Sequence, residues 1–137
     1  MKIMISLLTV AALMPFSLFA DHHAQATPAP VEVWTCNLNE GKTLDDVRKV
    51  SEMVAKVTAD AKIPTAQWIF TPFTGDMDSG RFMLMTGWTD FNSMGKGFHS
   101  FFVAGDGAEV LTEWEATATC ATRNLLLVES TFNQMGG

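Results

Sequence analysis

Four segments of the chain are rich in the β-branched, aromatic and aliphatic residues that are typical of strands. These segments are 31–38, 67–73, 81–90 and 117–130. The last two carry apolar residues at both alternating positions, a pattern typical of strands that are covered on both faces. The turn-forming segment 75–80 separates the second strand from the third. The sequence therefore predicts a sheet that needs a covering layer on each side.

Helical periodicity occupies the two longer connections between these strands. Segment 44–61 places apolar residues three or four positions apart, which predicts an amphipathic helix with Thr43 as its N-cap. After the third strand, large apolar residues again recur at helical spacing until the glycines of segment 105–107 interrupt them. These residues are Phe91, Met94, Phe98 and either Phe101 or Phe102. Segment 108–116 predicts a further helix that turns its large apolar residues inward.

The order of these elements is strand, helix, strand, strand, helix, strand. This βαββαβ order predicts an α+β, ferredoxin-like fold with an antiparallel four-stranded sheet. Right-handed connections place the first and third strands at the centre of the sheet and the second and fourth strands at its edges.

The only two cysteines lie near opposite ends of two strands that this topology makes neighbours. Cys36 is near the end of the first strand, and Cys120 is near the start of the fourth. Antiparallel pairing of the two strands brings these positions together, so a disulfide is predicted. Two free, buried thiols are the alternative.

The N-terminal segment predicts export. Residues 1–20 combine a short basic start with an apolar run that ends in a small residue, which is typical of a secretory signal peptide. A membrane anchor is the alternative. Cleavage after Ala20 or Ala26 fits the small-residue rule, and residues 21–30 are expected to form a disordered linker. The folded domain is then expected to span 31–130, followed by a loose tail over 131–137. The predicted location is the periplasm or the exterior of the cell.

The charge of the chain limits its partners. The formal net charge is -6 at pH 7, without a basic cluster. This acidity argues against nucleic acid, and against a membrane surface once the signal has been removed. A zinc site is not expected, because the predicted domain contains His99 as its one histidine.

The apolar character of the strands predicts a partner of another kind. A ferredoxin-like sheet has helices on one face only, so its second apolar face needs a cover. The same face of a second copy is the simplest cover, which predicts a homodimer joined sheet to sheet.

The chain resembles the dimeric α/β-barrel superfamily, and within it the antibiotic-biosynthesis-monooxygenase-like group. The resemblance rests on the strand order and on Trp88-Thr89-Asp90-Phe91, which is similar to the family's junction between third strand and second helix. It implies a dimeric barrel and, in some members, cofactor-independent oxygenation or haem degradation. The haem-degrading members use an asparagine of the first strand, which Asn37 or Asn39 matches, and a later helical histidine, which His99 matches. Their helical tryptophan is absent here, where Gly97 or Phe98 stands near its place.

Aromatic residues and methionines in the sheet and the second helix predict an apolar binding cavity, with core or dimer packing as the alternative. The candidate ligand-binding residues are Trp68, Trp88, Met83, Met85 and Phe98, with Phe70 beside them. His99 is a candidate base or haem ligand, together with Asn37, and the alternative for His99 is an exposed helix residue. The first prediction is a protein that binds a small apolar ligand without established catalysis. An enzyme and a purely structural interaction module are the alternatives, and no cofactor is identified.

One metal site is predicted only for one of the two cleavage positions. If cleavage follows Ala20, His23 becomes the third residue of a free amino terminus. The amine, two backbone amides and this imidazole then offer a square-planar nitrogen set that suits Cu(II) or Ni(II). Cleavage after Ala26 removes the motif.

Overall fold

The structure, a computed structural model, describes residues 27–75, 78 and 80–131. The predicted signal peptide, the His23 motif, most of the predicted linker and the tail lie outside the described residues. No helix within the described part of the chain is long and apolar enough to cross a membrane.

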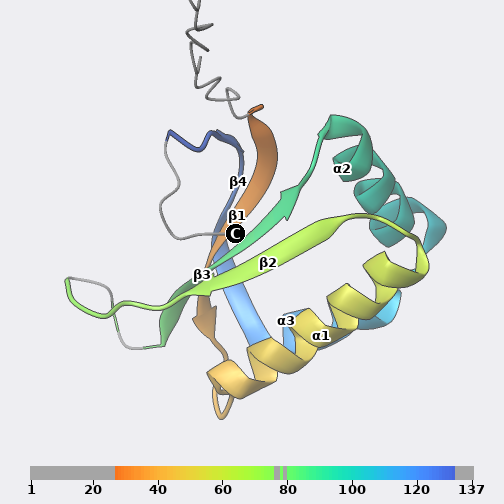
Figure 1. The fold of residues 1–137 in the computed structure, drawn as a ribbon. Helices are drawn as coiled ribbons and strands as arrows, with labels where there is room; N and C mark the ends of the chain where they lie inside the picture. The colour runs from red at the N-terminus through yellow and green to blue at the C-terminus, as the bar shows by residue number, and fades with distance from the viewer. Residues whose placement is uncertain (1–26, 76–77, 79, 132–137) are drawn as a thin grey trace, which may run out of the picture.

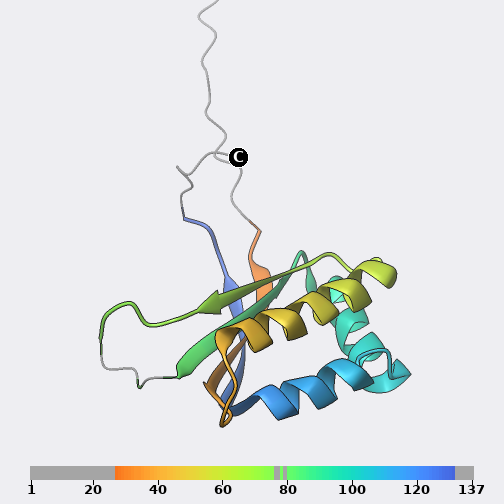
Figure 2. The same cartoon turned by 90° about the horizontal axis from the view of Figure 1, so that it is seen from below.

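The four predicted strands form one antiparallel sheet, and the helices cover one of its faces (Figures 1 and 2). In chain order the elements are β1 (Ala29–Leu38), α1 (Leu44–Asp60), β2 (Thr65–Phe70), β3 (Arg81–Trp88), α2 (Phe91–Phe98), the π-helix η1 (His99–Ala104), α3 (Ala108–Thr117) and β4 (Ala118–Val128). The strand order is β2-β3-β1-β4. Both the ferredoxin-like fold and the central position of the first and third strands are therefore confirmed.

Several strand boundaries differ from the prediction by one to three residues, and two of these differences have a clear structural cause. β1 begins at Ala29 rather than at Val31, because Ala29 and Pro30 pair with the end of β4. β2 ends at Phe70 rather than at residue 73, ahead of Pro72, which has no N–H with which to extend the strand. The prediction had assigned residues 29 and 30 to the linker, and it had assigned residues 71–73 to the second strand.

The second helix packs on the sheet through small residues and through only part of the predicted apolar stripe, since Phe98 stands edge-on to Trp88 of β3. Phe91 is 61% exposed, whereas Ser93 and Gly97 are buried. The reason is Trp88 at the end of β3, whose indole fills the space under the helix. A Cβ atom at Gly97 would lie 3.0 Å from Trp88 Nε1, so a larger residue here would require the indole to shift by a few tenths of an ångström.

Asp90 gives the junction between β3 and α2 its shape. Its side chain caps α2 by accepting a 2.7 Å hydrogen bond from the backbone N–H of Ser93. This bond, assisted by the Ser93 hydroxyl, lowers the pKa of Asp90 from its ordinary value. Asp90, one of the four residues that carry the family resemblance, therefore acts here as a helix cap.

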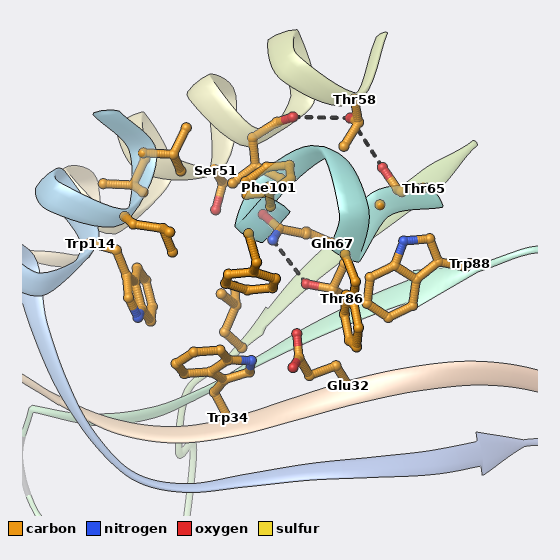
Figure 3. A pocket seen from close by; sticks show the side chains of 18 residues that line it. Glu32, Trp34, Ser51, Thr58, Thr65, Gln67, Thr86, Trp88, Phe101 and Trp114 are labelled. Atoms are coloured by element: carbon orange, nitrogen blue, oxygen red, sulfur yellow. Dashed lines mark hydrogen bonds between the residues drawn. The ribbon is translucent and has the colours of Figure 1, made fainter. Parts of the chain in front are cut away.

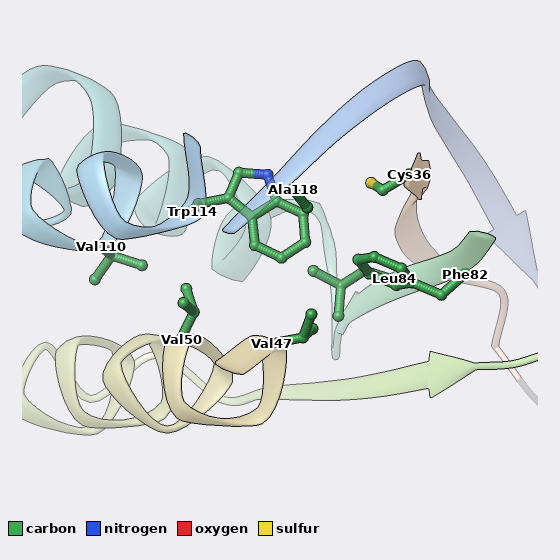
Figure 4. Packing of buried hydrophobic residues seen from close by; sticks show 8 residues of the cluster. All are labelled: Cys36, Val47, Val50, Phe82, Leu84, Val110, Trp114 and Ala118. Atoms are coloured by element: carbon green, nitrogen blue, oxygen red, sulfur yellow. The ribbon is translucent and has the colours of Figure 1, made fainter. Parts of the chain in front are cut away.

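The main core lies where α1 and α3 pack on the sheet (Figure 4). Trp114 of α3 stands edge-on to Phe82 of β3, with ring centroids 6.1 Å apart. Cys36 of β1 is fully buried beside this cluster and forms the predicted disulfide with Cys120 of β4. The pairing predicted from topology is confirmed.

The opposite face of the sheet carries no helix in the described part of the chain (Figure 2). Trp68 and Phe70 of β2 are 46% and 42% exposed, and Leu126 of β4 is 51% exposed. Trp68 lies across Gly87, which places its ring on this face beside Val31. We refer to this apolar surface, made of Val31, Trp68, Phe70, Met83, Met85 and Leu126, as the open face.

A candidate ligand-binding cavity

A cavity lies between the helices and the covered face of the sheet (Figure 3). Its empty volume is about 700 Å³, part of which opens to solvent. All three α-helices, the π-helix η1 and the strands β1, β2 and β3 contribute side chains to its wall. The cavity therefore depends on the whole fold and not on one loop.

Aromatic rings make up much of the wall. They belong to Trp34, Trp88, Trp114, Phe98, Phe101 and Phe102. Several of these rings meet edge to face, as Trp34 does with Trp114 at 6.1 Å and Trp88 with Phe98 at 5.5 Å between centroids. This arrangement favours contact between the ring edge of one side chain and the face of the next. The wall is consequently suited to a flat, apolar molecule.

Gly107 determines where one of these rings lies. A Cβ atom at Gly107 would lie 2.3 Å from Phe101 Cδ1, so a larger residue at this position would displace the Phe101 ring. Gly107 directly precedes α3, and Phe101 belongs to η1. The glycine thus allows η1 to turn an aromatic side chain into the cavity.

One carboxylate points into this aromatic space. Glu32 of β1 is 6% exposed, and Figure 3 shows its carboxylate directed from the strand into the cavity. Among the lining residues it is the only one with an acidic or basic side chain. A buried carboxylate needs a charged or hydrogen-bonding partner, and part of that need is met by Arg123 of β4, whose Nε donates to Glu32 Oε1.

Arg123 of β4 contacts three of the aromatic rings that line the cavity. Its guanidinium carbon lies 5.0 Å from the ring centroid of Trp34, 5.4 Å from that of Phe98 and 5.3 Å from that of Phe102. These separations are within the range of cation–π attraction. One side chain therefore links β4, β1, α2 and η1 around the buried charge.

Two further polar side chains reach the cavity from α1 and β2. Gln67 Nε2 donates a 2.9 Å hydrogen bond to Thr86 Oγ1, which fixes the orientation of the Gln67 carboxamide. Its other polar atom, Oε1, is buried without a hydrogen-bond partner, and so is Ser51 Oγ. Both side chains point into the same space (Figure 3). The cavity thus presents one unpaired acceptor and one unpaired hydroxyl.

No protein-family model matches the sequence, and no curated protein sequence does so either. Solved structures do match. SnoaB, a cofactor-independent oxygenase from Streptomyces nogalater, aligns with a TM-score of 0.56 and 13% identity, over 79% of this chain and 100% of SnoaB. A hypothetical protein from Arabidopsis thaliana aligns with a TM-score of 0.50 and 8% identity, over 83% of this chain and 98% of that one.

The chain has a ferredoxin-like α+β fold, which it shares with SnoaB. The fold that the resemblance implied is confirmed. Sequence identities this low establish the fold alone, so the activity of SnoaB is not transferred to this chain by the alignment.

Within this fold, two of the five predicted ligand-binding residues reach the cavity. Trp88 and Phe98 are part of its wall. Trp68 of β2 pairs with Met85 of β3, and Phe70 pairs with Met83, on the open face and away from the cavity. The predicted cavity is therefore present, with a different set of side chains around it.

The predicted catalytic residues do not meet at the cavity. His99 is exposed at the start of η1, and Asn37 is exposed near the end of β1. Neither contributes to the cavity wall. The alternative candidate, Asn39, bonds to the backbone of Glu115 and to the hydroxyl of Thr119, at 2.9 and 2.8 Å. It therefore ties the first turn to α3 and β4.

The sequence interpretation missed Glu32, Trp34, Ser51, Gln67 and Arg123. The alternation of β1 contained a usable signal, because Glu32 and Trp34 have the same parity as the buried Cys36. A glutamate on the inward side of a central strand is unusual and deserves a functional explanation. Arg123 offered no such signal, since it lies 91 positions from its partner.

Proposed function

We propose that this protein binds a small aromatic molecule that carries a hydrogen-bond donor, in the cavity between the helices and the sheet. The observation that carries the proposal is Glu32, a buried carboxylate surrounded by aromatic rings and directed into empty space. The rings suit a flat apolar body. The carboxylate accepts hydrogen bonds only, so it selects a hydroxyl or amino group.

The test uses 1-naphthol as a probe, because it joins an aromatic body to a single hydroxyl donor. Isothermal titration calorimetry is expected to show saturable binding of 1-naphthol. Leu111→Phe, a change on the α3 side of the cavity, is expected to weaken this binding at least about tenfold, because the added ring occupies the same space. Glu109→Phe, on the exposed side of α3, is the matched control and should leave the affinity unchanged.

Two results would overturn the proposal. The first is the absence of any 1-naphthol binding to the folded wild-type protein. The second is equal affinity in the wild type and in Leu111→Phe, which would place the probe elsewhere on the molecule. The circular dichroism spectrum of each variant checks that the fold is retained.

The enzyme alternative, with His99 and Asn37 as catalytic residues, stays a prediction. No contact in the described part of the chain brings these two side chains together at the cavity, so we propose no catalytic function. The same holds for the Cu(II) or Ni(II) motif at His23, which lies outside the described residues.

We also propose that two copies of the chain associate through their open faces. The support is the apolar character of this surface, on which Trp68, Phe70 and Leu126 are between 42% and 51% exposed. Exposed aromatic and aliphatic side chains gathered on one face are typical of an association surface. A second copy offers the same apolar surface in return.

This association is tested by two neighbouring leucines of β4. Leu126 lies on the open face opposite Val31, whereas Leu125 lies on the other face opposite Glu32. Their exposed fractions are similar, 51% and 55%. Leu126→Lys is expected to convert a dimer into a monomer in sedimentation velocity measurements, and Leu125→Lys is expected to leave the dimer intact. A monomeric wild type, or identical behaviour of the two variants, would contradict the sheet-to-sheet arrangement.

Export is proposed on the basis of the signal-like N-terminal sequence together with the disulfide between Cys36 and Cys120. Disulfides of this kind persist in oxidising compartments such as the periplasm or the cell exterior. The pairing thus supports the compartment that the first twenty residues predict.

A further inference from the structure

A second hollow lies beside the aromatic cavity, between the second half of α1 and the edge strand β2. Its empty volume is about 520 Å³, including open solvent. Apart from the residues that it shares with the cavity, its wall is small and aliphatic. Ala55, Ala59, Ile63 and Pro64 belong to it. We refer to this space as the α1–β2 hollow.

The hollow and the cavity share one partition. Ser51, Val54, Thr58, Thr65 and Gln67 line both spaces. Shared lining on this scale means that the two spaces adjoin along the line where α1 faces β2.

Some polar groups of the partition are already paired within the protein. The Thr58 hydroxyl lies 3.0 Å from the Val54 carbonyl oxygen, to which it donates, and it accepts a 3.2 Å hydrogen bond from Thr65 Oγ1. Gln67 Nε2 donates to Thr86. These bonds hold the partition in one arrangement.

The remaining two polar atoms of the partition have no partner. Ser51 Oγ and Gln67 Oε1 are buried and form no hydrogen bond within the described part of the chain. Because Nε2 is already engaged, the free atom of the Gln67 carboxamide is an acceptor. The Ser51 hydroxyl can donate to an acceptor of the ligand. Buried polar atoms without partners are rare, so this pair requires an explanation.

We propose that the α1–β2 hollow is a second subsite for the ligand of the aromatic cavity. The ligand class is an aromatic ring that carries the hydrogen-bond donor for Glu32 and is joined through a secondary amide to a short aliphatic chain. The amide carbonyl accepts from Ser51, the amide N–H donates to Gln67 Oε1, and the chain lies against the alanines and Ile63 of the hollow. This inference rests on the proposed function, because the ring occupies the same aromatic cavity.

A pair of probes isolates the contribution of the hollow. N-methyl-1-naphthamide and N-butyl-1-naphthamide share the ring and the amide, and they differ only in the length of the chain. Calorimetric titration is expected to show that the butyl compound binds at least about tenfold more tightly to the wild type, from three additional buried methylene groups. Ala55→Phe fills the hollow and should remove this difference, whereas Lys56→Phe, exposed on the neighbouring position of α1, should preserve it.

A second variant tests the amide contacts. Ser51→Ala is expected to weaken the binding of both naphthamides by the same factor, about fivefold to tenfold for the loss of one hydrogen bond. The ratio between the butyl and methyl compounds should stay as in the wild type, because the hollow itself is intact.

Failure of this inference can be distinguished from failure of the proposed function. If 1-naphthol binds and Leu111→Phe weakens it, the cavity proposal stands. Equal affinities of the two naphthamides in the wild type, or a chain-length effect that survives Ala55→Phe, would then overturn the subsite alone. Retained 1-naphthol affinity shows that Ala55→Phe is folded, and the circular dichroism spectrum checks the fold of Ser51→Ala.

Discussion

Replacement of Cys36 and Cys120 by alanine is expected to lower the free energy of unfolding by about 4–5 kcal/mol. The two cysteines are 84 positions apart, so the disulfide closes most of the domain into one loop. In the chain-entropy account, a cross-link over this distance removes a large part of the freedom of the unfolded chain. Alanine is preferred to serine because Cys36 is fully buried, where an unpaired hydroxyl would add its own cost.

Urea unfolding of the wild type and of the double variant measures this effect. Reduced wild-type protein should match the variant to within about 1 kcal/mol, since both lack the cross-link. The reductant should leave the variant unchanged, which separates loss of the disulfide from other effects of the reagent. A difference below about 1 kcal/mol between oxidised wild type and variant would contradict the prediction.

The disulfide also lies close to the strand pair that positions Arg123 beside the aromatic cavity. It joins β1 to β4 beside the irregular register between Thr35 and Cys36. Beyond this irregularity, Arg123 is paired with Trp34 in the next part of the ladder. The cross-link therefore joins the two strands close to the residue pair that places the Arg123 guanidinium beside Trp34, Phe98 and Phe102.

The fold was predictable because strand order and helix periodicity are local patterns. The apolar stripe of α1 contains Val47 and Val50, which are both buried, and the topology alone brought the cysteines together. These features can be predicted from the sequence of one element at a time, or from the order of the elements along the chain.

The cavity was less predictable, because β3 is apolar on both faces. Phe82, Leu84 and Trp88 face the helices, whereas Met83 and Met85 lie on the open face. When both parities are apolar, the sequence does not tell which set lines the interior. Met83 and Met85 were assigned to the wrong side for this reason, and so was Trp68, because β2 also carries large apolar residues at both parities.

The prediction of the helical part of the cavity wall failed for a different reason. Small residues of α2 face the sheet because Trp88 fills the space beneath them. This contact joins α2 to β3, so the helical periodicity of the α2 sequence does not reveal it. The π-helix η1 then shifts the rotational position of Phe101 and Phe102 relative to a regular helix. Long-range packing determined which aromatic residues enter the cavity.

Arg123→Ala is expected to destabilise the protein by about 3 kcal/mol, because it leaves the Glu32 carboxylate buried without its cation. Breaking a fully buried ion pair costs about 3–5 kcal/mol. The Arg123 side chain is 43% exposed, so the lower end of this range applies. Loss of the guanidinium from the three aromatic rings adds to the effect. Urea unfolding at neutral pH provides the measurement.

A double variant separates the charge from the packing. Glu32→Gln together with Arg123→Ala removes the buried charge, so this protein should be more stable than Arg123→Ala alone. The stability that the second change restores reports the cost of the unpaired carboxylate, and the remainder reports the lost ring contacts. Arg48→Ala is the control, because Arg48 and Asp45 form an exposed ion pair whose removal should change stability by less than about 1 kcal/mol.

The same variants connect stability to binding. A carboxylate kept in an aromatic cavity is a poor choice for stability alone, because an apolar residue of similar size would pack there without a counter-ion. If the function of Glu32 is to bind a ligand, Glu32→Gln should lower the affinity for 1-naphthol at least about tenfold. The reason is that the charged acceptor of the ligand hydroxyl is replaced by a neutral one. Unchanged affinity in Glu32→Gln, with the expected loss of stability in Arg123→Ala, would assign the pair a structural role and leave the aromatic wall as the determinant of binding.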